Sequence, residues 1–172
     1  MHLYRNLKLT PCPHCKITGA LILHGRLFGY AEHEDHFKTC RGRRIFCSNR
    51  KKRKNGCGHT FSIWGADKLG RLRIGTNTLW AFVKLVLSMG NKALALRTLN
   101  VGLSCSSAYR IWTRFVNGQS RIRTALTQRC PPPDLPRVCR PAEQTVAHLQ
   151  AVFPHAPCPI AAFQQQLQIA FL

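Results

Sequence analysis

Acidic residues are scarce in this sequence. Only six aspartates and glutamates stand against 26 lysines and arginines in 172 residues, which gives a formal net charge of +20. The six acids are Glu32, Glu34, Asp35, Asp67, Asp134 and Glu143. So few carboxylates leave little material for metal-dependent phosphoryl transfer or for a paired general acid and base. We therefore expect a binding protein that has no small-molecule substrate and is not an enzyme.

Long apolar runs are also missing. No stretch approaches the roughly 18–20 apolar residues of a membrane-spanning helix, so we expect no membrane association. The first residues, MHLYRNLKLTPCPHC, lack the apolar core of a secretory signal peptide. This predicts a cytoplasmic, nucleoid-associated protein. In such a reducing compartment, nine cysteines indicate metal ligands before disulfides.

Positive charge is distributed unevenly along the chain. Residues 1–78 carry 16 lysines and arginines against four acids, residues 79–129 carry eight and no acid, and residues 130–172 carry two of each. Charge that serves solubility alone mixes both signs. The pattern indicates a polyanion-binding body followed by a neutral tail. The densest basic run, Arg50-Lys51-Lys52-Arg53-Lys54, is either a solvated loop or, as we predict, a phosphate contact.

Four cysteines are spaced as two ligand pairs. Cys12-Pro13-His14-Cys15 is a C-x2-C knuckle, a tight turn that directs two thiolates toward one tetrahedral metal. Cys47 and Cys57 form the second pair, in which a basic insertion widens the usual two-residue gap. We predict that these four cysteines hold one structural Zn²⁺, because four thiolates leave no open position for a catalytic water.

Other residues compete for the metal site or imitate one. Cys40 is an alternative to Cys47, and His14 or His59 is an alternative to one thiolate. The segment Glu32–His36 is expected to be a polar loop, because its histidines are three residues apart and H-E-x-x-H needs four. The cysteines that occur singly are interpreted as packing residues: Cys105, Cys130, Cys139 and Cys158.

The middle of the chain has helical periodicity. Apolar residues at 79, 82, 83 and 86 follow the i, i+3, i+4, i+7 spacing of a helix that ends at Gly90-Asn91. A short helix over Lys92–Leu99, a turn over Asn100–Leu103 and a second helix over Cys105–Val116 with Ser104 as N-cap follow. Short helix, glycine-containing turn and second helix are typical of a helix-turn-helix.

The second of these helices has the properties of a DNA-recognition helix. Small hydrogen-bonding groups come early and cations come later on its outward face, a pattern that suits base edges and then phosphates. The candidate contact residues are Ser106, Ser107, Tyr109, Arg110, Thr113 and Arg114. Arg110 is the candidate for a bidentate contact to guanine. An ordinary three-helix bundle with a basic face is the alternative. Arg121, Arg123 and Arg129 are expected to extend the basic surface.

The sequence thus predicts an α+β protein in four segments. Short strands over Ala20–Leu23, Arg44–Cys47 and Thr60–Trp64 form a small antiparallel zinc ribbon. The four segments are a ribbon with its basic insertion (1–75), a helix-turn-helix bundle (79–129), a proline-rich linker (130–141) and an apolar helical tail (142–172).

The tail has two predicted pieces. A helix is expected over Ala142–Phe153, and a second apolar piece over Ile160–Leu172 places Phe163, Leu167 and Phe171 on one helical stripe. We expect this stripe either to dock onto the chain's own bundle or to bind a partner, such as a transposase or a second copy of the chain.

A ribbon of this kind followed directly by helix-turn-helix resembles a known family. The residues are Cys12-Pro13-His14-Cys15, the basic strand Arg43 to Cys47, Cys57-Gly58-His59-Thr60-Phe61, and Ser104 to Arg110. Together they resemble the N-terminal DNA-binding region of insertion-sequence transposases and their short accessory proteins. The resemblance implies that ribbon and helices bind double-stranded DNA at element ends, while a separate acidic-triad domain, absent from this sequence, cuts it.

The sequence therefore favours a zinc-dependent DNA-binding protein of a mobile element, acting as a transposition accessory or a transcriptional regulator. Arg43, Arg44 and the basic run 50–54 are expected to join the helical residues in contacting DNA. The alternative is an RNA-binding zinc-ribbon protein, which would use aromatic side chains for stacking on unpaired bases.

Overall fold

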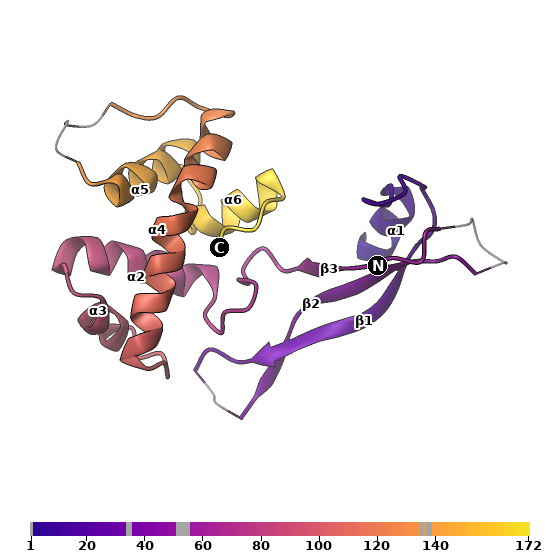
Figure 1. Cartoon of the computed structure of the whole chain (residues 1–172), viewed down its shortest axis with the longest axis horizontal. Helices are drawn as coiled ribbons and strands as arrows, with labels where there is room; N and C mark the ends of the chain where they lie inside the picture. The colour runs from indigo at the N-terminus through magenta and orange to yellow at the C-terminus, as the bar shows by residue number, and fades with distance from the viewer. Residues whose placement is uncertain (1, 34–35, 51–55, 135, 137–138) are drawn as a thin grey trace. The chain divides into compact units, whose positions relative to one another are not determined.

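The chain folds into two compact units. A computed structural model describes residues 2–33, 36–50, 56–134, 136 and 139–172 (Figure 1). The ribbon unit comprises Met1–Gly29 and Lys38–Gly65, and the helical unit comprises Tyr30–Phe37 and Ala66–Leu172. Each unit has a hydrophobic core of its own. The expected α+β class is confirmed, with a sheet followed by helices.

The ribbon unit is a three-stranded sheet with one helix. Its elements are α1 (His2–Leu9), β1 (Leu21–Tyr30), β2 (Lys38–Cys47) and β3 (Thr60–Trp64), in the sheet order β1-β2-β3. β2 pairs antiparallel with β3 and places Ile45 opposite Phe61. The core is small: Leu7, Cys12, Ala20, Leu21, Ile45 and Cys47 are its buried members. Two of these six are predicted metal ligands, so apolar burial alone gives this unit little stability.

Two features of the ribbon differ from the prediction. The strands β1 and β2 are longer than the predicted Ala20–Leu23 and Arg44–Cys47. The prediction missed their outer parts because most side chains beyond Leu21 in β1 and before Ile45 in β2 are not buried, so the sequence there has no alternating apolar pattern. The helix α1 was not predicted. Its Leu7 is buried, and the Lys8 ammonium donates to the carbonyls of Gly19 and Leu21 at 3.2 and 3.1 Å.

The described residues of the helical unit form five helices around one core. They are α2 (Thr76–Met89), α3 (Lys92–Thr98), α4 (Cys105–Thr127), α5 (Pro141–Val152) and α6 (Pro159–Leu167). α2 ends as expected at Gly90, whose φ of 70° is left-handed, and the Asn91 side chain accepts from the Leu94 N–H to begin α3. Ser104 precedes α4 as predicted, without a side-chain capping bond.

The boundary between the units differs from residue 75. Leu69 and Ile74 are buried in the core of the helical unit, so the segment 66–75 belongs with the helices. The segment 30–37 is also part of this unit. The Glu32 carboxylate accepts from the Gly75 N–H at 3.2 Å, and the Arg73 Nε donates to the Ala31 carbonyl at 2.7 Å. These contacts join residues more than 40 positions apart, which no local pattern indicates.

α4 continues eleven residues beyond its predicted end at Val116. Asn117 and Gly118 follow that end and have weak helix propensity, but the buried face continues through Gln119, Ile122 and Leu126. A Cβ on Gly118 would meet only ordinary contacts at 3.6 Å or more, so the glycine is no break in the packing. Tertiary packing thus overrides the weak helix propensity of this dipeptide.

The tail docks onto the chain's own bundle, which is the first of the two expectations. α5 and α6 contribute Leu149, Ile160 and Phe163 to the common core. α6 ends at Leu167, because Gln168 adopts a left-handed φ of 56°. The predicted single stripe over Ile160–Leu172 is therefore wrong beyond Leu167. Phe171 is still fully buried, stacked on Phe115 at 6.2 Å between ring centroids.

Three arginines that were expected to extend the basic surface also contact this tail. Arg121 donates to the carbonyls of Ala170 and Phe171, both at 3.1 Å. Arg123 donates to the Gln144 side chain, and Arg129 donates to the Gln166 carbonyl. Because their guanidinium groups are engaged within the unit, they do not simply extend a free basic surface.

Replacing Phe171 by alanine tests the docked tail. A buried phenylalanine truncated to alanine loses about 3–5 kcal/mol, so we expect a large fall in the free energy of unfolding in urea, followed by helical circular dichroism. The exposed Met89 on α2 is the matched control, and Met89→Ala is expected to change stability by about 0.5 kcal/mol or less. Equal effects of the two substitutions would show that the tail is undocked in solution.

None of the helices among the described residues is both long enough and apolar enough to span a bilayer.

Candidate metal centre and nucleic-acid interface

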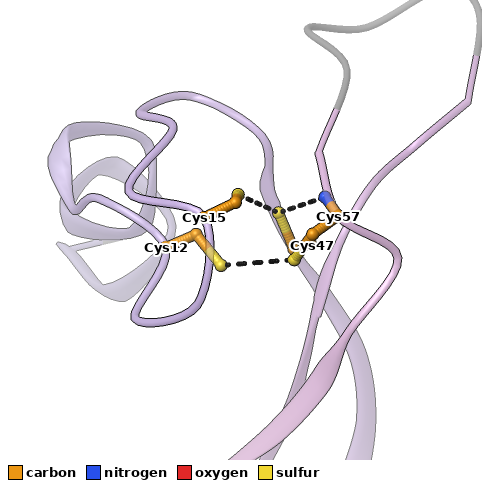
Figure 2. A group of neighbouring side chains, drawn as sticks. All are labelled: Cys12, Cys15, Cys47 and Cys57. Atoms are coloured by element: carbon orange, nitrogen blue, oxygen red, sulfur yellow. Dashed lines mark hydrogen bonds between the residues drawn. The ribbon is translucent and has the colours of Figure 1, made fainter.

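Four cysteines converge at one end of the ribbon unit. The sulfur atoms of Cys12, Cys15, Cys47 and Cys57 all lie within 4.8 Å of one another. Figure 2 shows the first pair on the turn after α1 and the second pair at the end of β2 and before β3. Cys12 and Cys47 are buried, whereas Cys15 and Cys57 are half-buried. The structure thus brings together the four residues that the spacing predicted.

The two cysteine pairs sit on equivalent turns despite their different spacing. The residue after each second cysteine, Lys16 or Gly58, has a left-handed φ, of 62° and 74° respectively. In each turn its N–H donates to the carbonyl of the first cysteine, Lys16 to Cys12 at 2.9 Å and Gly58 to Cys47 at 3.0 Å. The insertion between Cys47 and Cys57 therefore leaves the knuckle geometry intact.

The sulfur separations fit a tetrahedral thiolate centre. A zinc–sulfur bond of about 2.3 Å gives a tetrahedron whose edges are about 3.8 Å. The Cys12 and Cys57 sulfurs are 3.8 Å apart, and the Cys15 and Cys47 sulfurs are 3.7 Å apart. The Cys57 N–H also donates to the Cys47 sulfur at 3.4 Å, a contact that stabilises a thiolate. The residues present are compatible with one structural zinc.

The acid–base properties of the cluster also call for a cation. Burial raises the pKa of Cys12, but hydrogen bonds from the backbone N–H groups of Cys15 and His14 lower it more, to about 6. Burial raises the pKa of Cys47 to about 12. The raised pKa of Cys47 keeps its thiol protonated at neutral pH when no cation is bound. A bound cation would supply the charge that holds all four as thiolates.

The alternative ligands lie outside the cluster. Cys40 is exposed on β2, where its thiol donates to the Gly42 carbonyl at 3.4 Å. The exposed rings of His14 and His59 stack on each other, with centroids 4.6 Å apart. Neither imidazole belongs to the group of residues whose ligand atoms converge on the centre.

The ribbon presents part of its predicted basic surface. Arg43 lies opposite Ile63 and Arg44 opposite Ser62 on the β2–β3 pair, with Arg44 exposed and Arg43 half-buried. Arg50 is exposed just after β2, and its N–H approaches the Ser48 hydroxyl at 3.5 Å. Lys51, Lys52, Arg53 and Lys54 lie outside the described residues.

The N-terminal half of α4 exposes most of the predicted contact residues. Tyr109 is 54% exposed, Ser107 is half-buried, and the remaining four are exposed: Ser106, Arg110, Thr113 and Arg114. The opposite face of the helix is buried through Ala108, Ile111 and Phe115. Lys92 of α3 lies 5.5 Å from the Tyr109 ring centroid and 6.0 Å from that of Trp112, which fixes the two helices at this end.

Two further arginines face this part of α4 and were not among the predicted site residues. Arg71 and Arg73, in the segment before α2, line a cavity together with Arg110 and Arg114. Nothing in the sequence links positions 71–73 to positions 110–114, so only the fold reveals this grouping.

Comparison with known proteins identifies no relative. No protein-family model matches the chain, and no curated protein or solved structure matches it.

Proposed function

We propose that this protein binds duplex DNA through α3 and α4, which act as a helix-turn-helix, with a structural zinc in the ribbon unit. The observation that carries the proposal is the exposed face of α4. It combines hydroxyl groups and arginines, and it lies within residues 79–129, which contain eight lysines and arginines and no acid. Such a surface attracts phosphates without an internal counter-charge.

The packing of α3 on α4 supports this assignment. Ala95 and Leu96 of α3 are buried in the same core as Ala108 and Ile111 of α4. Residues 99–104 connect the helices, and Asn100 there has a left-handed φ of 47°. The first helix thereby fixes the second, and the first turns of the second are left exposed. Recognition helices present these turns to base edges in the major groove.

The zinc has a structural role in this proposal. Four thiolates would complete the coordination shell and leave no position for a water molecule. The metal holds the two knuckles, and with them β3 and β2, the strand that carries Arg43 and Arg44. The basic run that follows Arg50 adds charge next to the second knuckle. The ribbon thus supplies phosphate contacts rather than chemistry.

A role in a mobile element, as a transposition accessory or transcriptional regulator, is the class that best fits this combination. It rests on the resemblance of the cysteine ribbon and helices to the DNA-binding region of insertion-sequence transposases. Phe163 and Phe171 are buried in the helical unit, so this proposal does not use them to bind a transposase or a second copy.

RNA binding is the second candidate, because one observation favours it. The segment around the β1–β2 connection exposes three aromatic side chains: Phe28 and Phe37 are each 58% exposed and Tyr30 is 51% exposed. Exposed aromatic rings beside cations are typical of surfaces on which unpaired bases stack.

A competition assay separates the two candidates. Zinc-loaded protein is bound to a labelled duplex, and unlabelled duplex or structured RNA of equal length is added at constant salt. We expect duplex to compete at least about tenfold better than RNA, because the α4 face fits a major groove that an A-form helix does not offer. Stronger competition by RNA would favour the second candidate.

A Phe28→Ala/Phe37→Ala variant provides the control for stacking. It should leave duplex affinity unchanged and lower any residual RNA affinity, because a stacked aromatic contributes about 1–3 kcal/mol per base. Loss of duplex affinity in this variant would place the aromatic residues in the DNA interface instead.

A further inference from the structure

A cavity of about 170 Å³ in the helical unit is lined by four arginines. Arg71 and Arg73 come from the segment before α2, and Arg110 and Arg114 come from the second and third turns of α4, beside Ser107. Its apolar side includes the buried Ile111. A volume of this size equals that of about five or six water molecules in the liquid, enough for a tetrahedral anion.

The charge of three of these arginines is not neutralised by the described part of the chain. Lys68 pairs with Asp67 and Arg140 with Glu143, and no ion pair among the described residues involves Arg71, Arg110 or Arg114. The Arg110 guanidinium donates to the Ser107 hydroxyl at 3.3 Å, which directs it along this side of α4. Cations gathered in one concavity repel each other unless an anion lies between them.

Arg73 has a different part in the cavity. Its Nε donates to the Ala31 carbonyl at 2.7 Å, and its Nη1 donates to the Gly102 carbonyl at 3.3 Å. It therefore fixes the segment before α2 against the turn that precedes α4. This contact holds the two walls of the cavity in place.

The backbone at Arg71 points to a use for its side chain. Its φ is 59°, in the left-handed region that glycine adopts without strain and arginine does not. A long cationic side chain is therefore carried at a position where glycine would cost less free energy. Strain of this kind is found where a side chain serves a site.

The cavity lies beside the exposed stripe of α4. Ser107, Arg110 and Arg114 follow i, i+3, i+7 spacing, and so do Ser106, Tyr109 and Thr113, one residue earlier. The two sets form neighbouring stripes on one helix. In a groove, a helix that presents one stripe to base edges brings the neighbouring stripe close to the sugar–phosphate backbone.

We propose that this cavity binds one backbone phosphate of the DNA, held jointly by Arg71, Arg110 and Arg114. The guanidinium fork matches phosphate oxygens, and three forks from two segments surround one such group. This inference rests on the proposed function and refines it. It makes Arg110 a phosphate contact rather than a guanine reader, and it leaves base recognition to the stripe of Ser106, Tyr109 and Thr113.

Salt dependence of duplex binding tests the proposal. Each phosphate neutralised contributes about 0.9 to the slope of log affinity against log salt concentration. We expect the Arg71→Gln/Arg110→Gln/Arg114→Gln variant to lose about one such contribution, because all three side chains hold the same phosphate. The loss of affinity should be equal on cognate and random duplexes. Lys84→Gln on α2, which removes a cation that does not line the cavity, should leave the slope unchanged.

Two results would overturn the proposal that these arginines share one phosphate. A slope that falls by about two or three contributions would mean separate contacts, and an unchanged slope would mean no contact. A loss confined to one sequence would restore Arg110 as a base reader.

A second measurement separates this proposal from the proposed function. Inorganic phosphate is titrated into the full chain while the arginine Nε–Hε signals are followed by nuclear magnetic resonance. We expect the signals of Arg71 and Arg110 to shift together with one apparent affinity. If the protein binds no duplex but these signals shift, the proposed function fails and the cavity is a site for a free phosphate group. If they do not shift and no duplex binds, both proposals fail.

Discussion

Cys12→Ser is expected to abolish metal binding and unfold the ribbon unit while the helical unit stays folded. The zinc content should fall from about one ion per chain to about a tenth or less, because binding energy at a structural site is largely folding energy. Among its described residues, this unit buries only four apolar side chains besides the two cysteines, so this core cannot compensate for a lost ligand. Zinc content is measured by atomic emission after dialysis, and folding by circular dichroism and amide exchange.

Cys40→Ser is the matched control for this prediction. Cys40 lies on the same β2 strand as Cys47, is exposed and is not one of the four clustered thiols. Its substitution should leave zinc content at about one ion and change stability by about 0.5 kcal/mol or less. If Cys40→Ser releases the metal and Cys47→Ser does not, Cys40 is the ligand and Cys47 is not.

The separate cores of the two units predict how the helical unit responds when the ribbon unit loses its metal. Leu79, Phe82, Ile122 and the other members of the helical core share no residue with the ribbon core. Chelation or a ligand substitution should therefore remove the protection of ribbon amides and leave that of α2 and α4 intact. A single cooperative loss of both units on metal removal would show that they depend on each other.

Arg110→Glu/Arg114→Glu is expected to have the largest effect on DNA binding. Truncating one interface arginine costs about 1–3 kcal/mol, and reversing two charges places repulsion beside phosphates as well. Duplex affinity should fall at least about 100-fold at moderate salt, the equivalent of about 2.7 kcal/mol. Both side chains are exposed, so helical circular dichroism should be unchanged. Fluorescence anisotropy with a labelled duplex gives the affinity.

A control with the same change in net charge makes this result interpretable. Arg5→Glu/Lys84→Glu also lowers the net charge by four, but neither residue lines the cavity or the exposed stripe of α4. Its loss of affinity should be about tenfold or less, from the weakened overall field alone. Similar losses in the two variants would mean that DNA is held by net charge and not by this face.

The metal site was the most predictable part of the molecule. A knuckle is a local structure, so Cys12-Pro13-His14-Cys15 identifies it from four residues. The second knuckle was harder, because Cys47 and Cys57 are ten positions apart. The residues that flank it identified it, and the turns at Lys16 and Gly58 show the physical reason: both have the same hydrogen bond and left-handed φ although the cysteine spacings differ.

The features that could not be predicted from the sequence depend on tertiary contacts. The extension of α4 past Gly118 and the burial of Phe171 depend on each other, because the tail packs where the helix continues. The same contacts bring the exposed Arg121 into hydrogen bonds with carbonyls of the tail. Periodicity within one segment reports a buried face but not what covers it.

The cavity at Arg71 could not be predicted either, because it too depends on tertiary contacts. Its two walls come from residues 71–74 and 103–114, and they meet because Leu69 and Ile74 anchor the segment before α2 in the helical core. Arg110 was recognisable as an exposed cation from its helix alone. Its grouping with Arg71 depends on the fold.

Selection of duplexes from a random library is the most direct test of the central claim, that this chain is a zinc-dependent reader of duplex DNA. Zinc-loaded full-length protein is used at moderate salt, with the Arg110→Glu/Arg114→Glu variant in parallel. The account predicts an enriched motif for the unaltered protein and none for the variant. Retention of no duplex, or equal retention of all sequences by both proteins, would contradict it.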